Sequence, residues 1–166
     1  GGGRLTDPAV CRLGGQLARA SLNKRGLLWV RGNVRCQSAV NSGVHVLLPA
    51  KVCGERSGIL TMSGRRMSRQ RAFLTPPGET KPDWWIVSEV AKRLGFGAAF
   101  DFNSAADVFR EHASLSAFEN NGDRDFDIGA LTSLSDAAFD AMAPALWPAR
   151  SGAPQPQPRV FAAGWF

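Results

Sequence analysis

One stretch of the chain, residues 55–71, carries the side chains that could hold a phosphorylated ligand. It contains two glycines, a threonine hydroxyl and five arginines. Glycine lets a phosphate approach the backbone, a hydroxyl donates a hydrogen bond, and the planar guanidinium group binds phosphate oxygens in pairs. The same residue types also suit a solvent-exposed basic loop. Composition therefore leaves both interpretations open.

A second group of residues, three alternating aspartates, resembles the start of a calcium-binding loop. Asp123, Asp125 and Asp127 stand at the first three ligand positions. The sixth position is Ile128 rather than glycine, and the twelfth is Leu134 rather than a bidentate glutamate. The sequence therefore favours an acidic surface turn over a calcium site.

The cysteines and histidines do not have the spacing of a metal site. Cys11, Cys36 and Cys53 form no C-x-x-C pair, and His45 and His112 stand in distant segments. No pattern places a general base near a nucleophile. We therefore predict neither a metal ligand nor a catalytic residue in this chain. Scattered cysteines in an odd number suit a reducing compartment, and we expect a cytoplasmic protein.

The net charge of +6 is divided unevenly along the chain. Residues 1–75 hold 13 Lys and Arg and 2 acids, whereas residues 76–166 hold 7 Lys and Arg and 12 acids. A basic half can bind a polyanion, so a small nucleic-acid-binding module is an alternative from another class. Such a module stacks bases on interleaved aromatic rings, and Trp29 and Phe73 are the only aromatic residues in this half. No apolar run approaches the roughly 18 residues of a membrane span.

The basic stretch follows an apolar run that predicts a buried strand. Residues 44–48 are rich in β-branched and aliphatic side chains and are closed by Pro49, as in a strand buried on both faces of a parallel sheet. Ligands of open α/β sheets bind beyond the carboxyl ends of such strands. Residues 59–62 are a shorter apolar run, residues 65–71 are predicted to be a basic loop, and residues 27–30 could form another strand.

Three helices are predicted after the basic stretch. Asp83 caps an amphipathic helix that ends at Gly95, which suits the left-handed C′ position. Ser104, with Asp107 three residues later, resembles a capping box. A third helix is predicted to begin near Ser133 and to stop before the next proline.

From residue 44 onward, a series of short motifs resembles the molybdopterin-dependent oxidoreductase family. In that family a D-V-V-L-P-A strand is followed by E-x-x-G-T-x-T-N-x-E-x-R and then by P-P-G-E-A-R-P-D-W-x-I. The corresponding motifs here are V-L-L-P-A at 46–50, E-R-S-G-I-L-T at 55–61, R-R at 65–66, P-P-G-E at 76–79 and P-D-W-W-I at 82–86. Each motif is short, and their shared order makes the resemblance specific.

Later motifs are similar to the assimilatory nitrate reductase branch of this family. They are S-A-A-D-V-F-R-E-H at 104–112, E-N-N-G at 119–122, R-D-F-D-I at 124–128, L-W-P at 146–148 and R-V-F at 159–161. The resemblance covers residues 44–166. Another member of the family, such as a formate dehydrogenase, remains an alternative.

The resemblance implies an internal piece of a much larger catalytic subunit that reduces nitrate to nitrite. The cofactor of such a subunit is molybdenum on two molybdopterin guanine dinucleotides, with a [4Fe–4S] centre whose ligands lie outside this chain. The implied partners are the remainder of the subunit, an electron-donor protein and nitrate, with no membrane. We expect the chain alone to have no turnover.

The resemblance also implies which residues contact the cofactor. The matching positions are Glu55, Gly58, Thr61, Arg65 and Arg66. The family's Thr, Asn and Glu are replaced by Ile59, Met62 and Gly64.

The expected fold class is α/β, as a partial Rossmann-like open sheet with packed helices. We expect residues 1–43 to be a divergent segment and residues 44–150 to be part of the family's α/β domain. Residues 151–166 are expected to form a proline-rich linker and the start of a further element.

Overall fold

The computed structural model describes residues 29–32 and 45–152. Most of the segment expected to be divergent, with Cys11 and Cys36, lies outside these ranges, as does the proline-rich stretch after residue 152. The described residues contain no helix long and apolar enough to cross a membrane.

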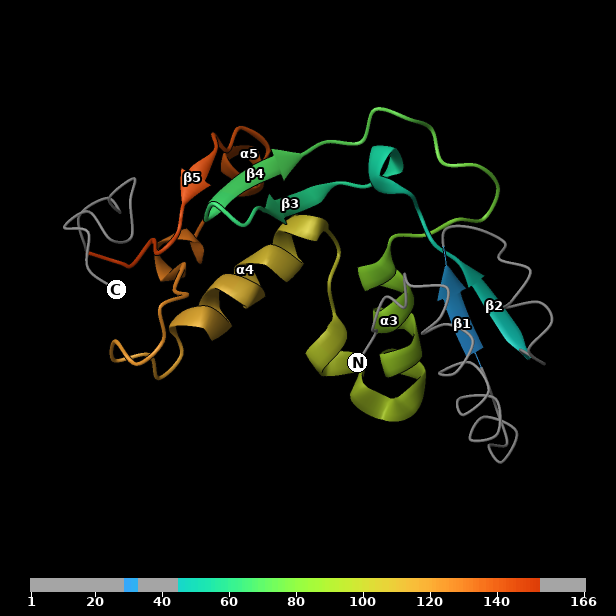
Figure 1. The fold of residues 1–166 in the computed structure, drawn as a ribbon. Coiled ribbons are helices and arrows are strands. Elements are labelled where there is room, and N and C mark those ends of the chain that lie inside the picture. The colour runs from blue at the N-terminus through green and yellow to red at the C-terminus, as the bar shows by residue number, and fades with distance from the viewer. Residues whose placement is uncertain (1–28, 33–44, 153–166) are drawn as a thin grey trace, which may run out of the picture.

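Two small sheets organise the described part of the chain (Figure 1). Strands β1 (Trp29–Gly32) and β2 (Val46–Pro49) form a parallel pair, and α3 (Asp83–Ala91) lies near them. Strands β3 (Gly58–Thr61), β4 (Arg66–Gln70) and β5 (Ala145–Leu146) form an antiparallel sheet in that order. Helix α4 (Ala105–Ala117) covers this sheet, and α5 (Asp136–Asp140) lies at its edge.

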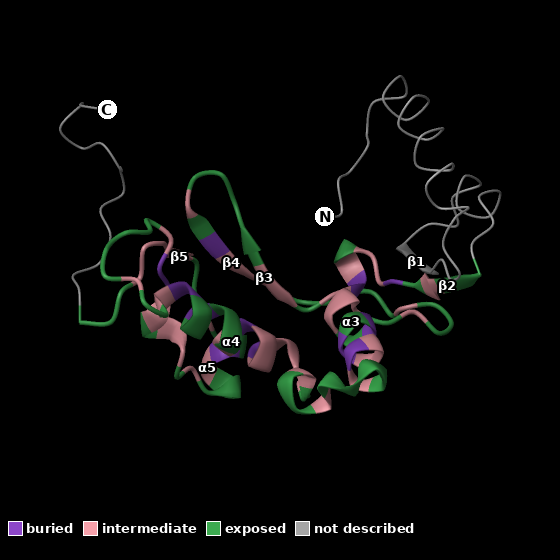
Figure 2. Cartoon of the chain, turned by 90° about the horizontal axis from the view of Figure 1, so that it is seen from below, coloured by how far each residue is buried: buried purple, intermediate pink, exposed green. Residues whose placement is uncertain are grey.

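The main core lies between the β3–β4 hairpin and α4. Figure 2 shows buried residues on β4 and along the inner face of α4. The buried side chains of this core are apolar and come from four segments: Met67, Ala106, Phe109, Ala113, Ile128 and Phe139. Met67 and Ile128 are the largest fully buried side chains. The dense apolar packing of this core holds the hairpin against the helix.

The helix ends follow the local signals in the sequence. Ser104 Oγ accepts a hydrogen bond from Asp107 N at 3.2 Å, and the Asp107 carboxylate accepts one from Ser104 N at 2.9 Å, which confirms the capping box. Gly95 has a φ of 93°, as expected for the residue that ends the preceding helical turns. The cap of α3 is Pro82 rather than Asp83, which stands at the first helical position. The short α5 is capped by Ser135.

The α/β class is confirmed, but two local predictions are wrong. Residues 66–70 form strand β4 rather than a basic loop. The sequence shows no alternation of apolar and polar residues here, because one of the two inward side chains of the strand is charged. The inward residues are Met67 and Arg69. Strand β2 is not buried on both faces among the described residues, since Val46 and Leu47 are 40% and 38% exposed. The larger sheet is antiparallel, and the described strands do not make up an open parallel sheet.

We predict that Asp107 gives the fold a pH-dependent share of its stability. The pKa of Asp107 is lowered, first by the hydrogen bond from Asn103 N and further by those from Arg110 and Ser104. Such a carboxylate stabilises the fold fully above its unfolded pKa of about 3.9, and this contribution is lost as the pH falls through the folded value. In urea unfolding of the full chain from about pH 7 to about pH 3, Asp107→Asn should lose less stability than the wild type. The exposed control Asp123→Asn should follow the wild type, and an equal loss in both variants would contradict the prediction.

Candidate functional site

The site expected around residues 55–71 is built on the β3–β4 hairpin. The strands pair with Gly58 opposite Gln70 and Thr61 opposite Met67. The turn between them is closed by hydrogen bonds from Met62 N to Arg66 O at 2.9 Å and from Arg65 N to Met62 O at 3.0 Å. The hairpin therefore carries four of the five expected ligand-binding residues, Gly58, Thr61, Arg65 and Arg66.

Glu55 lies before the hairpin, in a 3₁₀ turn at Cys53–Glu55. The residue is buried, and its carboxylate accepts a hydrogen bond from Val52 N at 3.0 Å. The next residue, Arg56, donates to Asp83 Oδ2 at 2.8 Å and so joins the turn to α3. The hydrogen bond to the Cys53 thiol is the first cause that raises the pKa of Arg56, and Asp83 raises it further. The hydrogen bonds of Glu55 and Arg56 thus hold the turn in place.

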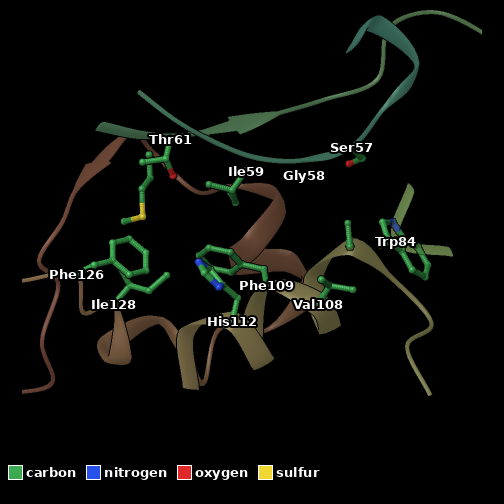
Figure 3. Close-up of a pocket in the computed structure, with 12 residues that line it drawn as sticks. Ser57, Gly58, Ile59, Thr61, Trp84, Val108, Phe109, His112, Phe126 and Ile128 are labelled. Atoms are coloured by element: carbon green, nitrogen blue, oxygen red, sulfur yellow. The ribbon is translucent and has the colours of Figure 1, made fainter. Parts of the chain in front are cut away.

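Gly58 and Thr61 lie on the wall of an apolar cavity of about 230 Å³ between the hairpin and α4 (Figure 3). The other wall comes from α4 and from the segment after it, including Phe109, His112 and Phe126. The His112 and Phe126 rings lie 5.4 Å apart. Because most of its lining is carbon, this cavity suits the apolar face of a ligand better than a phosphate.

Arg65 and Arg66 lie at the far end of the hairpin and point to different surroundings. Arg65 donates to Trp147 O at 2.9 Å, and its guanidinium carbon lies 6.0 Å from the centroid of the Trp147 ring. Arg66 is exposed at the start of β4, with no side-chain hydrogen bond or ion pair to any residue that the structure describes. Arg65 is therefore engaged in holding β5, whereas Arg66 has a guanidinium group available to a ligand.

A second cavity of about 410 Å³ lies beside the first, and its lining carries more polar groups. Its charged and hydroxyl-bearing lining residues come from the 3₁₀ turn, β4, the start of α4 and α5: Lys51, Glu55, Ser57, Arg69, Ser104, Asp136 and Asp140. Ser57 and Trp84 line both cavities. The structure therefore brings Gly58 and Thr61 to one cavity and Glu55 to its neighbour, and it leaves Arg66 outside both.

The interpretation of the sequence missed the importance of Arg69. This side chain is only 5% exposed and bonds to Ser57 and Asp140, which also line the second cavity. Its position two residues after Met67 is the one signal that could have shown it, because alternate residues of a strand share a face. A hydrophobicity pattern cannot show this, since arginine counts as an outward residue.

Comparisons with known proteins agree with the family resemblance. Residues 35–93 match the model of the family described as Molybdopterin oxidoreductase. The segment belongs to this family. A nitrate reductase of Klebsiella oxytoca is 56% identical over 104 residues, 63% of this chain and 12% of that protein. A nitrate reductase of Shewanella frigidimarina is 46% identical over 125 residues, which are 73% and 13% of the two chains.

Formate dehydrogenases of the family are similar over a shorter part. A putative formate dehydrogenase of Bacillus subtilis, YrhE, is 45% identical over 71 residues, 43% of this chain and 7% of that protein. All of these matches span only a small fraction of the relatives' length. Molybdopterin oxidoreductases are named for a molybdenum–pterin cofactor.

Groups on and beside the hairpin are of the kinds that bind phosphate or hydroxyl groups of a ligand. Arg66 offers a guanidinium group, Ser57 and Thr61 offer hydroxyls at the cavity walls, and the backbone at Gly64 is open, because a Cβ there would meet nothing within 4 Å. The described ranges contain no group of three or more His, Cys, Asp or Glu side chains that could hold a metal ion. These residues therefore offer contacts for phosphate and hydroxyl groups rather than metal ligands.

We predict that restoring the family's polar residues has different structural costs at the three departures. Met62 is 63% exposed and Gly64 faces open space, so Met62→Asn and Gly64→Glu should each change the free energy of unfolding by less than about 0.5 kcal/mol. Ile59 packs against the main core, so Ile59→Thr should cost about 1 kcal/mol. Urea unfolding of the full chain measures all three. Equal costs for Ile59→Thr and Met62→Asn would contradict the assignment of Ile59 to the cavity wall.

Proposed function

We propose that the chain forms part of a molybdenum-dependent nitrate reductase and contributes a scaffold for the guanine dinucleotide arms of its cofactor. The observation that carries the proposal is the extent of similarity to nitrate reductases. A match that covers 73% of the 166 residues must extend beyond residue 93, where the match to the family model ends, and must include all of α4. The matches to formate dehydrogenases cover 40 to 43% of the chain.

The proposed roles of the chain's residues are binding and orientation. Arg66 binds a phosphate of the dinucleotide, and Gly58 and Thr61 let the ligand approach the hairpin edge. Glu55 stabilises the turn that precedes the hairpin, and Arg65 orients the hairpin end through Trp147. The bound cofactor would supply the two-electron removal of an oxygen atom from nitrate. None of these side chains needs to change its protonation state during the reaction.

The parallel pair of strands supports a larger sheet in the parent protein. Parallel sheets occur almost only where both faces are covered, and the two central residues of β2 are apolar and partly exposed among the described residues. We therefore propose that residues 44–150 belong to an α/β domain in which further elements of the parent cover this parallel pair and extend it into a Rossmann-like sheet. The parent would be cytoplasmic. It would take electrons from a donor protein and receive them through a [4Fe–4S] centre bound outside this chain.

A formate dehydrogenase is the second candidate for the parent. Its support is the 45% identity to the Bacillus subtilis protein over 71 residues. The two candidates differ in substrate but share the proposed contacts to the cofactor. Activity with nitrate or with formate, measured on the same purified protein, separates them.

A chimera provides the test of the proposed scaffold. In the Klebsiella oxytoca nitrate reductase, the 104 matched residues are replaced by the corresponding residues of this chain, a graft that necessarily includes Arg66 and Arg93. We expect the purified chimera to retain molybdenum and to release guanine nucleotide on acid hydrolysis. Nitrate reduction with a reduced viologen donor should also be retained.

In the same chimera, Arg66→Ala should lower cofactor occupancy roughly tenfold, because a charge-assisted hydrogen bond contributes about 1.5–3 kcal/mol. The matched control is Arg93→Ala, whose side chain is 73% exposed and pairs with Glu89 on α3. A chimera without cofactor would overturn the proposed scaffold role. Equal occupancy in the two variants would overturn only the assignment of Arg66.

A further inference from the structure

Arg69 on β4 has a buried side chain whose guanidinium group contacts two other segments of the chain. Its side chain is 5% exposed, although arginine is almost never fully buried unless it is paired. On the side of α5, Nη2 lies 2.6 Å from Asp140 Oδ1, and the guanidinium carbon lies 4.4 Å from the centroid of the Phe139 ring. The ion pair and the cation–π contact join the hairpin to a helix seventy residues later in the chain.

The same guanidinium group also bonds to the entry of β3. Nη2 donates to Ser57 Oγ at 2.7 Å, and Nη1 donates to Gly58 O at 3.2 Å and to Gln70 O. Ser57 lines both cavities, and Gly58 lines the apolar one. A single planar group thus connects the residues that line the cavities with α5.

Two arginines bind Asp140, at the α5 end of this connection. Asp140, the last residue of α5, receives Arg69 on its carboxylate and Arg71 on its backbone carbonyl. The Asp140 side chain is itself 71% exposed, so its charge stays hydrated while that of Arg69 is buried. The ion pair therefore avoids most of the free-energy cost of removing two charges from water. The planar guanidinium group, rather than its charge, fixes the geometry of the contact.

We propose that Arg69 is a positioning residue that fixes Ser57 and Gly58 against α5 and so sets the shape of the cofactor-facing edge of the hairpin. The effect on a cofactor rests on the proposed function, whereas the effect on the hairpin does not. A lysine would keep the ion pair with Asp140 but lacks the planar fork that reaches Ser57, Gly58 and Phe139 together. Arg69→Lys therefore separates positioning from charge.

Hydrogen exchange of the full 166-residue chain tests the positioning directly. In Arg69→Lys, the backbone amides of β3 should exchange at least tenfold faster, while those in the middle of α4 change less than twofold. Asp140→Asn keeps Arg69 and should accelerate the same β3 amides two- to fivefold, which preserves the test if the lysine variant does not fold. Unchanged β3 exchange in Asp140→Asn, or uniform acceleration across β3 and α4 in Arg69→Lys, would overturn the proposal. The control Arg93→Lys should leave β3 unchanged.

The chimera described above then tests the consequence for the cofactor. Arg69→Lys in that protein should lower molybdenum and guanine nucleotide content at least fivefold relative to Arg93→Lys, without lowering the yield of folded protein. If the chimera binds cofactor and the lysine variant binds it equally well, the cofactor-facing part of the inference fails. If the parent chimera binds none, the proposed function fails, and the hydrogen exchange result on the full chain still decides whether Arg69 positions the hairpin.

Discussion

The packing of one face of the β3–β4 hairpin on α4 is the constraint on which the rest of the described structure depends. Met67 is 1% exposed and lies in the core with Phe109 and Ile128. Because side chains alternate along a strand, the position of Met67 forces Arg69 onto the same inward face. The inward arginine must then find partners, and it finds them in α5 and at the entry of β3. The apolar core and the buried guanidinium group are thus consequences of one strand register.

That register also divides the expected ligand-binding residues between two environments. Gly58 and Thr61 line the apolar cavity, whereas Arg66 lies at the exposed start of β4. The two neighbouring cavities share Ser57, Trp84 and Ala105, so a shift of Ser57, the residue before β3, alters both of them. The packing on α4 and the contacts with α5 together set the position of the hairpin.

The sequence predicted local features better than the pairing of strands. Ser104 and Asp107 form the expected capping box, and Gly95 has the expected left-handed conformation, because both signals depend on a few adjacent residues. The strand at Arg66–Gln70 was not predicted, because its inward positions hold a methionine and an arginine. The exposure of β2 could not be predicted either, since an apolar strand has the same pattern whether or not other elements cover it. Cavity-lining residues were accessible only through the family resemblance.

The three departures from the family pattern differ in what they remove. Ile59 replaces a hydroxyl at the wall of the apolar cavity with a side chain that packs on the core, so it exchanges a possible ligand contact for stability. Met62 and Gly64 lie at the exposed hairpin turn, where an asparagine or glutamate would cost little. An acidic residue at position 64 would also stand next to two arginines and partly neutralise them. Its absence leaves Arg66 with its full positive field. Under the proposed function, the turn of this chain would therefore hold an anionic ligand more by charge and less by directional hydrogen bonds.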